Sequence, residues 1–345
     1  MNQSRTSFGV PRLDLASPGR SVAENIELAT LAERRGWGGF WVAETAGADA
    51  VATASAVATR LQSGRVGTAI IPMQTRDPLL LAMAASTIDQ VAPGGFILGL
   101  GTSTKLIIED WHATPWGASP LELTRECVGL ARRFLEGERI TTETGRWRYR
   151  RAQLAARPST PTPIYLAALN DRMLELAGEI ADGVILNFVT VADVDHAKRL
   201  VARGAERAGR DLDGFEFTVF FRATVTDDYE EVRERYQREL FTYVMAPVYQ
   251  KMFAREGFGD ACREIEGLWR AGERERALDS VPPTLIRERA LIGTVDDIRE
   301  RLAAYAEAGT DSTLVFPVAV PGRDYVEDCT RIIEALARIS HQGPR

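Results

Sequence analysis

The chain has 345 residues, of which 45% are hydrophobic and 26% charged, and its formal net charge is −6. This length accommodates one closed α/β barrel with insertions, and no apolar run approaches the roughly 20 residues of a membrane span. The acidic balance and the absence of a block of lysines and arginines argue against a nucleic-acid-binding protein.

Neither the N-terminus nor the cysteines indicate export or a metal centre. The opening segment MNQSRTSFGVPR contains no apolar targeting core. Cys127, Cys262 and Cys329 are widely spaced and odd in number, which argues against a disulfide framework and a zinc site. We therefore expect a cytoplasmic, metal-free protein that acts on a small molecule and has neither nucleic acid nor a membrane as its partner.

Strand-like and helix-like segments alternate along the chain. Apolar, β-rich runs predict strands over residues 8–10, 39–43, 66–71, 96–100, 164–168, 183–188, 216–225 and 312–317. Helical spacing predicts helices over residues 22–35, 50–61, 79–91, 121–135, 172–180, 194–208, 296–308 and 325–339. Residues 141–149 are predicted to form a hairpin that turns at Gly145.

This alternation predicts the fold class α/β, with a (β/α)8 TIM barrel as a single domain over residues 1–345. The pattern breaks down over residues 229–289, which we interpret as a helical insertion before the last strand. An open, doubly wound sheet is the alternative. In a barrel, ligands bind at the carboxyl ends of the strands. The predicted ends carry Glu44, residues 70–73, 101–104 and 168–170, Asn187 and Phe316.

Five segments, taken in order, resemble the luciferase-like monooxygenase superfamily, in particular its branch that uses the deazaflavin coenzyme F420. They are GWGGFWVAET, the long segment from RVGTAIIPMQ to GLGTS, DWHATPW, PIYLAALNDRMLELAGEIADGVILN and ALIGTVDDIRERLAAYAEAGTD. The family fold is a (β/α)8 barrel with an insertion before the last strands, which agrees with the prediction from the alternating pattern. The resemblance further implies a homodimer.

The resemblance also implies where the cofactor binds. A bulge in the third strand, with a cis peptide at Ala69-Ile70, is expected to support the back of the ring system, the alternative being an ordinary strand. Backbone amides and hydroxyls after the fourth and fifth strands are expected to bind the tail and its phosphate. The matching residues are Gly101, Thr102 and Ser103, then Ala167, Ala168, Leu169 and Asn170. The alternative is that these small residues only allow the strand and helix to pack.

Two titratable residues are the catalytic candidates. Glu44 ends the second strand, where relatives place an acid against the ring or its substrate; a solvated or salt-bridged carboxylate is the alternative. His112 lies beyond the fourth strand and could donate a proton as hydride arrives, although a lone loop histidine is more often structural. Thr45 and Thr104 replace a histidine and an acid of the sugar-phosphate dehydrogenase branch, which disfavours sugar-phosphate oxidation.

Three basic residues, Arg76, Lys105 and Arg125, could pair with an acidic cofactor tail or remain solvated. The leading hypothesis is hydride transfer between coenzyme F420 and an organic substrate, as alcohol oxidation or reduction of C=C, C=N or C=O. A flavin monooxygenase that uses FMN is the first alternative. A barrel that binds a flavin-like ligand without turnover is the second.

Overall fold

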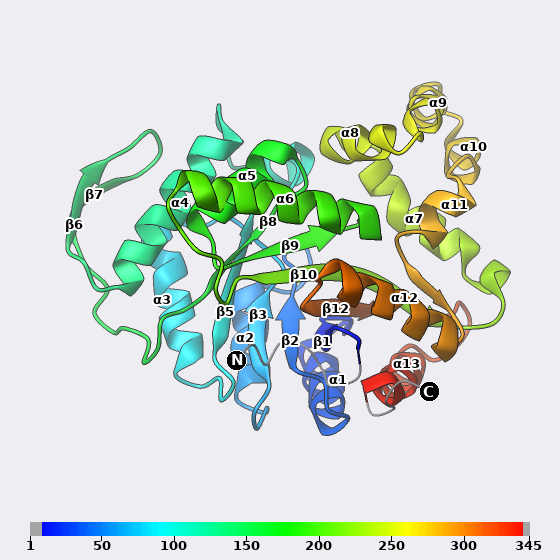
Figure 1. Ribbon diagram of the computed structural model, residues 1–345, viewed down its shortest axis with the longest axis horizontal. Coiled ribbons are helices and arrows are strands. Elements are labelled where there is room, and N and C mark those ends of the chain that lie inside the picture. Colours follow the sequence, from blue (N-terminus) through cyan, green and yellow to red (C-terminus); the bar gives the residue numbers. More distant parts are fainter. Residues whose placement is uncertain (1–8, 341–345) are drawn as a thin grey trace.

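The computed structural model describes residues 9–340, in which parallel strands form a closed barrel surrounded by helices (Figure 1). The barrel strands are β1 (Arg12–Ala16), β2 (Gly39–Val42), β3 (Arg65–Thr68), β5 (Phe96–Gly101), β8 (Ile164–Ala167), β9 (Gly183–Asn187), β10 (Glu216–Val225) and β12 (Ser312–Pro317). Each pairs in parallel with the next. Pairing of β12 with β1, with Arg12 opposite Ser312, closes the ring. The predicted (β/α)8 class is confirmed, and the open sheet is excluded.

The barrel helices begin at residues that favour helix N-termini. They are α1 (Val22–Arg34), α2 (Ala50–Ala58), α3 (Pro78–Asp89), α4 (Pro120–Leu135), α5 (Asp171–Ile180), α6 (Val191–Arg207), α12 (Val295–Ala308) and α13 (Tyr325–Ala337). In each, the residue before the first turn is Ser, Thr, Asp or Asn, and its side chain accepts a backbone hydrogen bond. Such a cap is worth about 1 kcal/mol, so these residues help to fix where each helix starts.

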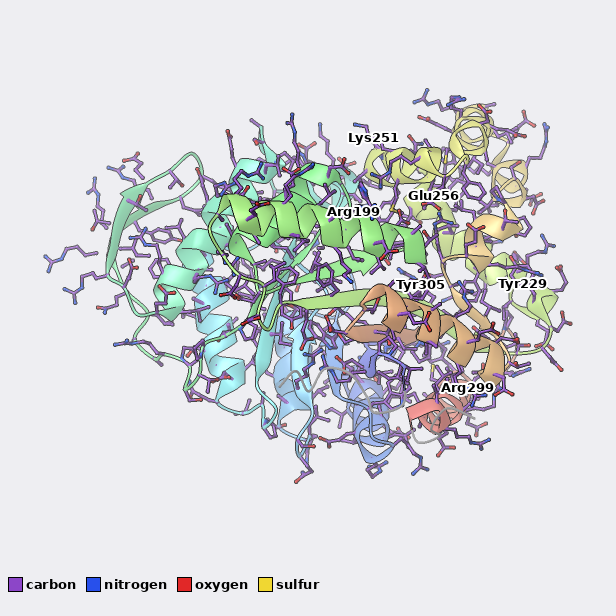
Figure 2. The ribbon with its side chains drawn as sticks, viewed as in Figure 1. Arg199, Tyr229, Lys251, Glu256, Arg299 and Tyr305 are labelled. Carbon is purple, nitrogen blue, oxygen red and sulfur yellow. The ribbon has the colours of Figure 1, made fainter. Side chains whose placement is uncertain are left out.

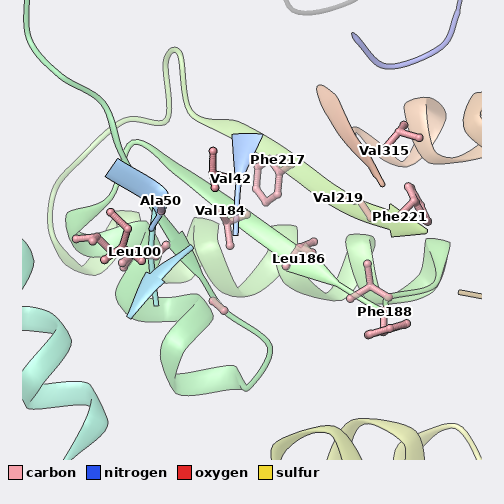
Figure 3. Packing of buried hydrophobic residues seen from close by; sticks show 14 of the residues in the cluster. Val42, Ala50, Leu100, Val184, Leu186, Phe188, Phe217, Val219, Phe221 and Val315 are labelled. Atoms are coloured by element: carbon pink, nitrogen blue, oxygen red, sulfur yellow. The ribbon is translucent and has the colours of Figure 1, made fainter. Parts of the chain in front are cut away.

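The strands are apolar on both faces because each face is buried. On β10, Val219 and Phe221 belong to the layer between strands and helices, which Figure 3 shows together with Val315 of β12. Phe220 points the other way, into a separate cluster inside the barrel that includes Trp41. Continuous apolar runs are therefore what this fold requires of its strands.

The predicted insertion consists of helices beside the barrel, where Figure 2 labels Tyr229, Lys251 and Glu256. It contains the 3₁₀ turn η2 (Tyr229–Glu231) and helices α7 (Arg233–Val244), α8 (Pro247–Arg255), α9 (Gly259–Arg270), α10 (Arg274–Asp279) and α11 (Pro283–Arg287). A short strand that was not predicted, β11 (Leu291–Gly293), then pairs with β10. Within residues 9–340, no helix combines the length and apolarity needed to cross a membrane.

Smaller elements complete the chain. The predicted hairpin is confirmed as β6 (Ile140–Glu143) and β7 (Arg148–Ala152), and η3 (Arg338–Ser340) follows α13. The prediction of one strand over residues 66–71 is wrong, because the chain is interrupted after β3 and resumes as β4 (Ile71–Pro72). A π-helical turn, η1 (Leu106–Trp111), occupies a segment that carried no predicted element.

The first predicted strand, over residues 8–10, is also wrong. Phe8 lies outside the described residues, Gly9 and Val10 form a bend, and the first strand is β1. The charged residues of β1 obscured it in the sequence, because Arg12 and Asp14 interrupt its apolar pattern. Both are held at the amino end of the barrel by partners on other strands.

These charges form a largely buried cluster across the amino ends of the strands. Arg65 donates to Asp14 at 2.8 Å and to Glu216 at 3.0 Å, and Arg12 donates to Glu216 at 2.8 Å. The Trp41 indole donates to the same Asp14 carboxylate at 2.9 Å. The cluster therefore links β1, β2, β3 and β10. Burial raises the pKa of Asp14 to about 6 even though Arg12 acts to lower it.

We expect Asp14 to make stability depend on pH. Between pH ~4 and pH ~6 the folded protein retains a proton that the unfolded chain releases, so the free energy of unfolding falls by about 3 kcal/mol as pH rises through this window. Asp14→Asn should remove this contribution in urea denaturation measured at several pH values. Asp110→Asn, at an exposed position, should retain the wild-type dependence. An unchanged slope in Asp14→Asn would contradict the assignment.

Candidate functional site

A cavity of about 220 Å³ opens at the carboxyl ends of the barrel strands. Its walls come from the segments after β2, β3, β5 and β8, from β9 and β10, and from helices α7 and α8 of the insertion. The predicted cofactor-binding residues that line it are Glu44, Ala69, Ile70, Thr102, Ser103, Ala167, Leu169 and Asn170. Gly101 and Ala168 are buried beside these lining residues and do not face the cavity themselves.

The wall after β3 is a backbone bulge. Its Ala69-Ile70 peptide is cis, as the resemblance implies, and the ordinary-strand alternative is excluded. The Ala69 amide donates to the carbonyl of Val42 at 2.8 Å, and the Glu44 amide donates to the carbonyl of Ile70 at 3.1 Å. The segment after β2 thus holds the bulge on one side, and Ala69 and Ile70 are presented to the cavity.

The other side of the bulge is fixed by β5. The hydroxyl of Thr68 donates to the carbonyl of Gly99 at 2.8 Å and is 2.9 Å from the Gly99 amide, which donates to it. A Cβ at Gly99 would lie only 1.7 Å from the carbonyl oxygen of Thr68. Glycine is therefore required here because the two backbones approach so closely.

Beyond β5 the chain turns sharply at the cavity. Ser103 has a φ of 57°, a left-handed conformation that is uncommon for a residue other than glycine. The carbonyl of Thr102 accepts from the Gln74 side chain at 3.0 Å, which anchors the turn. Within residues 9–340, neither the Thr102 nor the Ser103 hydroxyl has a hydrogen-bond partner. Two lining hydroxyls are thus free to bind a ligand.

The segment after β8 leads directly into helix α5. Asn170 caps this helix, its side-chain oxygen accepting from the Met173 amide at 3.0 Å. Asn170, Ala167 and Leu169 line the cavity, so the positive end of the α5 dipole lies at its wall. A helix N-terminus after β8, together with free hydroxyls after the neighbouring strand β5, is a combination that suits phosphate.

Glu44 lines the cavity but is held by a neighbouring cation. Its carboxylate forms an ion pair with Arg76, which also donates to it at 3.0 Å, and it accepts from the Ala50 amide at 3.0 Å. Arg76 pairs with Asp49 as well. The salt-bridged alternative for Glu44 therefore describes its ground state, and a catalytic role for it stays a prediction.

His112 is not among the cavity-lining residues. Its Nε2 lies 2.6 Å from the carbonyl oxygen of Thr45, so this nitrogen carries the proton and donates it. The contact ties the end of η1 to the segment after β2. This contact gives His112 a structural role, and its expected role as a proton donor to the substrate stays a prediction.

One wall of the cavity combines Phe220 and Arg222 of β10 with Tyr243 and Tyr249 of the insertion. Sequence reasoning missed the two residues of β10. Asn187, which the strand-end analysis did include, lies between them. The available signal was a single arginine inside the apolar strand sequence EFTVFFRATV, since a charge in a buried strand requires a partner or a function.

The cavity shows no donor set for a metal. Across the described part of the chain, residues 9–340, no group of three or more His, Cys, Asp or Glu side chains is arranged to hold one. All three cysteines are buried and unpaired. The cavity therefore offers a ligand backbone amides, hydroxyls, the salt-bridged Glu44 carboxylate and the Arg222 guanidinium.

Comparisons with known proteins agree on one family. A sequence profile described as luciferase-like monooxygenase matches residues 6–312. A 5,10-methylenetetrahydromethanopterin reductase of Methanolobus tindarius is 26% identical over 295 residues, covering 85% of this chain and 89% of the relative. A putative coenzyme F420-dependent oxidoreductase of Mycobacterium tuberculosis is 28% identical over 315 residues, covering 84% of this chain and 89% of the relative.

A solved structure has the same architecture. The coenzyme F420-dependent tetrahydromethanopterin reductase from Methanopyrus kandleri superposes with a TM-score of 0.80 at 22% sequence identity. The superposition covers 97% of this chain and 99% of that chain. At this identity, the likeness establishes the barrel fold.

The Glu44–Arg76 pair should be strongly coupled. Both side chains are largely buried, and breaking a buried pair costs about 3 kcal/mol because it leaves one charge without its partner. Glu44→Gln and Arg76→Met should each destabilise the protein, and in a double-mutant cycle measured by urea denaturation their costs should be non-additive. The exposed pair Glu143–Arg148 serves as control, with coupling of about 0.5 kcal/mol or less. Additive losses of stability in the Glu44 and Arg76 variants would contradict the strong coupling of this ion pair.

Proposed function

The chain belongs to the luciferase-like monooxygenase family and is an oxidoreductase, and we propose that it transfers a hydride between coenzyme F420 and an organic substrate. The relatives that support this choice of cofactor are named as F420-dependent proteins. The observation that carries the proposal is the bulge at Ala69-Ile70, which faces the cavity and is hydrogen-bonded from both sides.

The bulge would support one face of the deazaflavin ring. In the ring of eight strands, β3 and β10 are four places apart, so they form opposite walls of the barrel mouth. A planar ring against Ala69 and Ile70 would turn its other face toward β10, which leaves space there for a substrate. The F420 ring, when bound, supplies or accepts the hydride.

The phosphate of the cofactor would bind between two strand ends. Thr102 and Ser103 offer free hydroxyls after β5, and the α5 N-terminus, capped by Asn170, follows β8. These groups donate hydrogen bonds without bringing a competing negative charge. Ala167 and Leu169 would contact the same tail, whereas buried Gly101 and Ala168 would support the backbone around it.

Glu44 and His112 enter the proposal through the contacts that they make. The Arg76 clamp fixes the Glu44 carboxylate at the edge of the cavity, where it can orient the ring or its substrate. His112 fixes the carbonyl of Thr45, a lining residue. Both residues would thus keep the site preorganised, which is the contribution expected of a protein whose cofactor carries the chemistry.

FMN is the alternative cofactor, because the matching family is described as luciferase-like monooxygenase. Titration of the purified protein with each cofactor distinguishes the two, followed by absorbance and fluorescence. We expect coenzyme F420 to bind with a Kd of about 1 μM, which corresponds to about −8 kcal/mol, and FMN to bind much more weakly. Tight binding of FMN alone would favour the monooxygenase. Binding of F420 without turnover of any carbonyl, imine or enone substrate would favour a non-catalytic ligand-binding barrel.

The phosphate site can be tested separately. The double variant Thr102→Val/Ser103→Ala removes two hydroxyl donors, so the Kd for F420 should rise about tenfold or more. A deazaflavin that lacks the phosphate tail should bind this variant as well as it binds the wild type. Thr87→Val, on the exposed face of α3, is the matched control. If the truncated ligand loses affinity equally, the two hydroxyls do not bind the phosphate.

A further inference from the structure

Arg222 is a buried cation without an acidic partner. Its side chain is on β10, it lines the cavity, and the residue is only 7% exposed. Within residues 9–340, no carboxylate forms an ion pair with it. In contrast, the basic residues singled out from the sequence are all neutralised: Arg76 by Glu44 and Asp49, Lys105 by Glu109, and Arg125 by Glu179.

The guanidinium is held in place by neutral groups. One nitrogen donates to the side-chain oxygen of Asn187 at 2.6 Å, and another donates to the hydroxyl of Tyr243 at 2.8 Å. The Phe188 ring lies 4.1 Å from the guanidinium carbon. Phe188, labelled in Figure 3, adopts a φ of 55°, a conformation that is costly for a bulky residue. Local backbone strain therefore accompanies the positioning of this cation.

The hydrogen bonds of this wall leave several donor protons unused. The Asn187 amide donates to the hydroxyl of Tyr249 at 2.8 Å. The hydroxyls of Tyr243 and Tyr249 both act as acceptors within the network, so the proton of each remains to be donated. Burial raises the pKa of Tyr249, which keeps that proton in place at neutral pH. Remaining guanidinium protons add to this surplus.

Glu239 is the acid that comes near Arg222 from another direction. It lines a smaller cavity together with Arg222, Ser17 and Phe316. Its carboxylate pairs with Arg235 at 3.3 Å, so it is already partly neutralised. The main cavity therefore keeps a positive charge and donors on the β10 side.

We propose that Arg222, with the hydroxyls of Tyr243 and Tyr249, forms a carboxylate-binding subsite and that the substrate carries a carboxylate. The inference rests on the proposed function, because it places the substrate between the cofactor ring and β10. A carboxylate offers acceptors to a guanidinium in a fork geometry and supplies the missing negative charge. The group that exchanges hydride would then lie nearer the opposite wall, at Ala69 and Ile70.

The test uses F420-loaded protein and matched pairs of small ligands: acetate and acetamide, benzoate and benzamide, cinnamate and cinnamamide. Isothermal titration calorimetry should show that at least one carboxylate binds about tenfold more tightly than its amide. Arg222→Met should abolish this preference, and Arg222→Lys should retain part of it. Lys105→Met, which removes an exposed cation outside the cavity lining, should leave the preference unchanged.

The Kd for F420 shows whether Arg222 binds the substrate carboxylate or an anionic group of the cofactor. We expect it to change less than about threefold in Arg222→Met, because the substrate and not the cofactor uses this residue. A large loss of F420 affinity would assign Arg222 to an anionic group of the cofactor and overturn the inference. The absence of any carboxylate preference in the wild type would overturn it as well. Failure of wild-type protein to bind F420 would instead refute the proposed function.

Discussion

Closure of the barrel is the constraint on which the site depends. Pairing of β12 with β1 completes the ring of parallel strands, so the carboxyl ends of all of them meet at one mouth. The same closure places β3 opposite β10. At the amino end, the cluster of Arg12, Asp14, Arg65 and Glu216 joins β1, β3 and β10 across the interior. The charges that stabilise one end of the barrel are thus separated from the binding groups at the other.

The two facing walls of the mouth differ in their chemistry. The β3 wall presents Ala69 and Ile70, an apolar surface whose backbone is held by β2 and β5. The β10 wall presents Arg222 and, from the insertion, the hydroxyls of Tyr243 and Tyr249, which can donate hydrogen bonds to a ligand. An apolar support facing a row of donors suits a flat, conjugated cofactor on one side and a polar substrate on the other.

Patterning of the sequence was sufficient for the barrel and for one side of the site. Alternating apolar runs and helical spacing located most strands and helices, and the strand ends located Thr102, Ser103 and Asn170. Predictions failed where long-range partners decide the structure. Strand β1 was not predicted because Arg12 and Asp14 interrupt its apolar pattern, and the partners that hold these charges lie on distant strands. Arg222 was overlooked because its role depends on residues of β9 and the insertion, which no local pattern connects to it.

A crystal structure of the protein with bound coenzyme F420 tests this account most directly. The account predicts that the deazaflavin ring lies against Ala69 and Ile70, that the phosphate contacts Thr102 and Ser103, and that the free face of the ring is turned toward Arg222. A ring packed against the β10 wall, or a phosphate bound to Arg222, would contradict the assignment of the two walls.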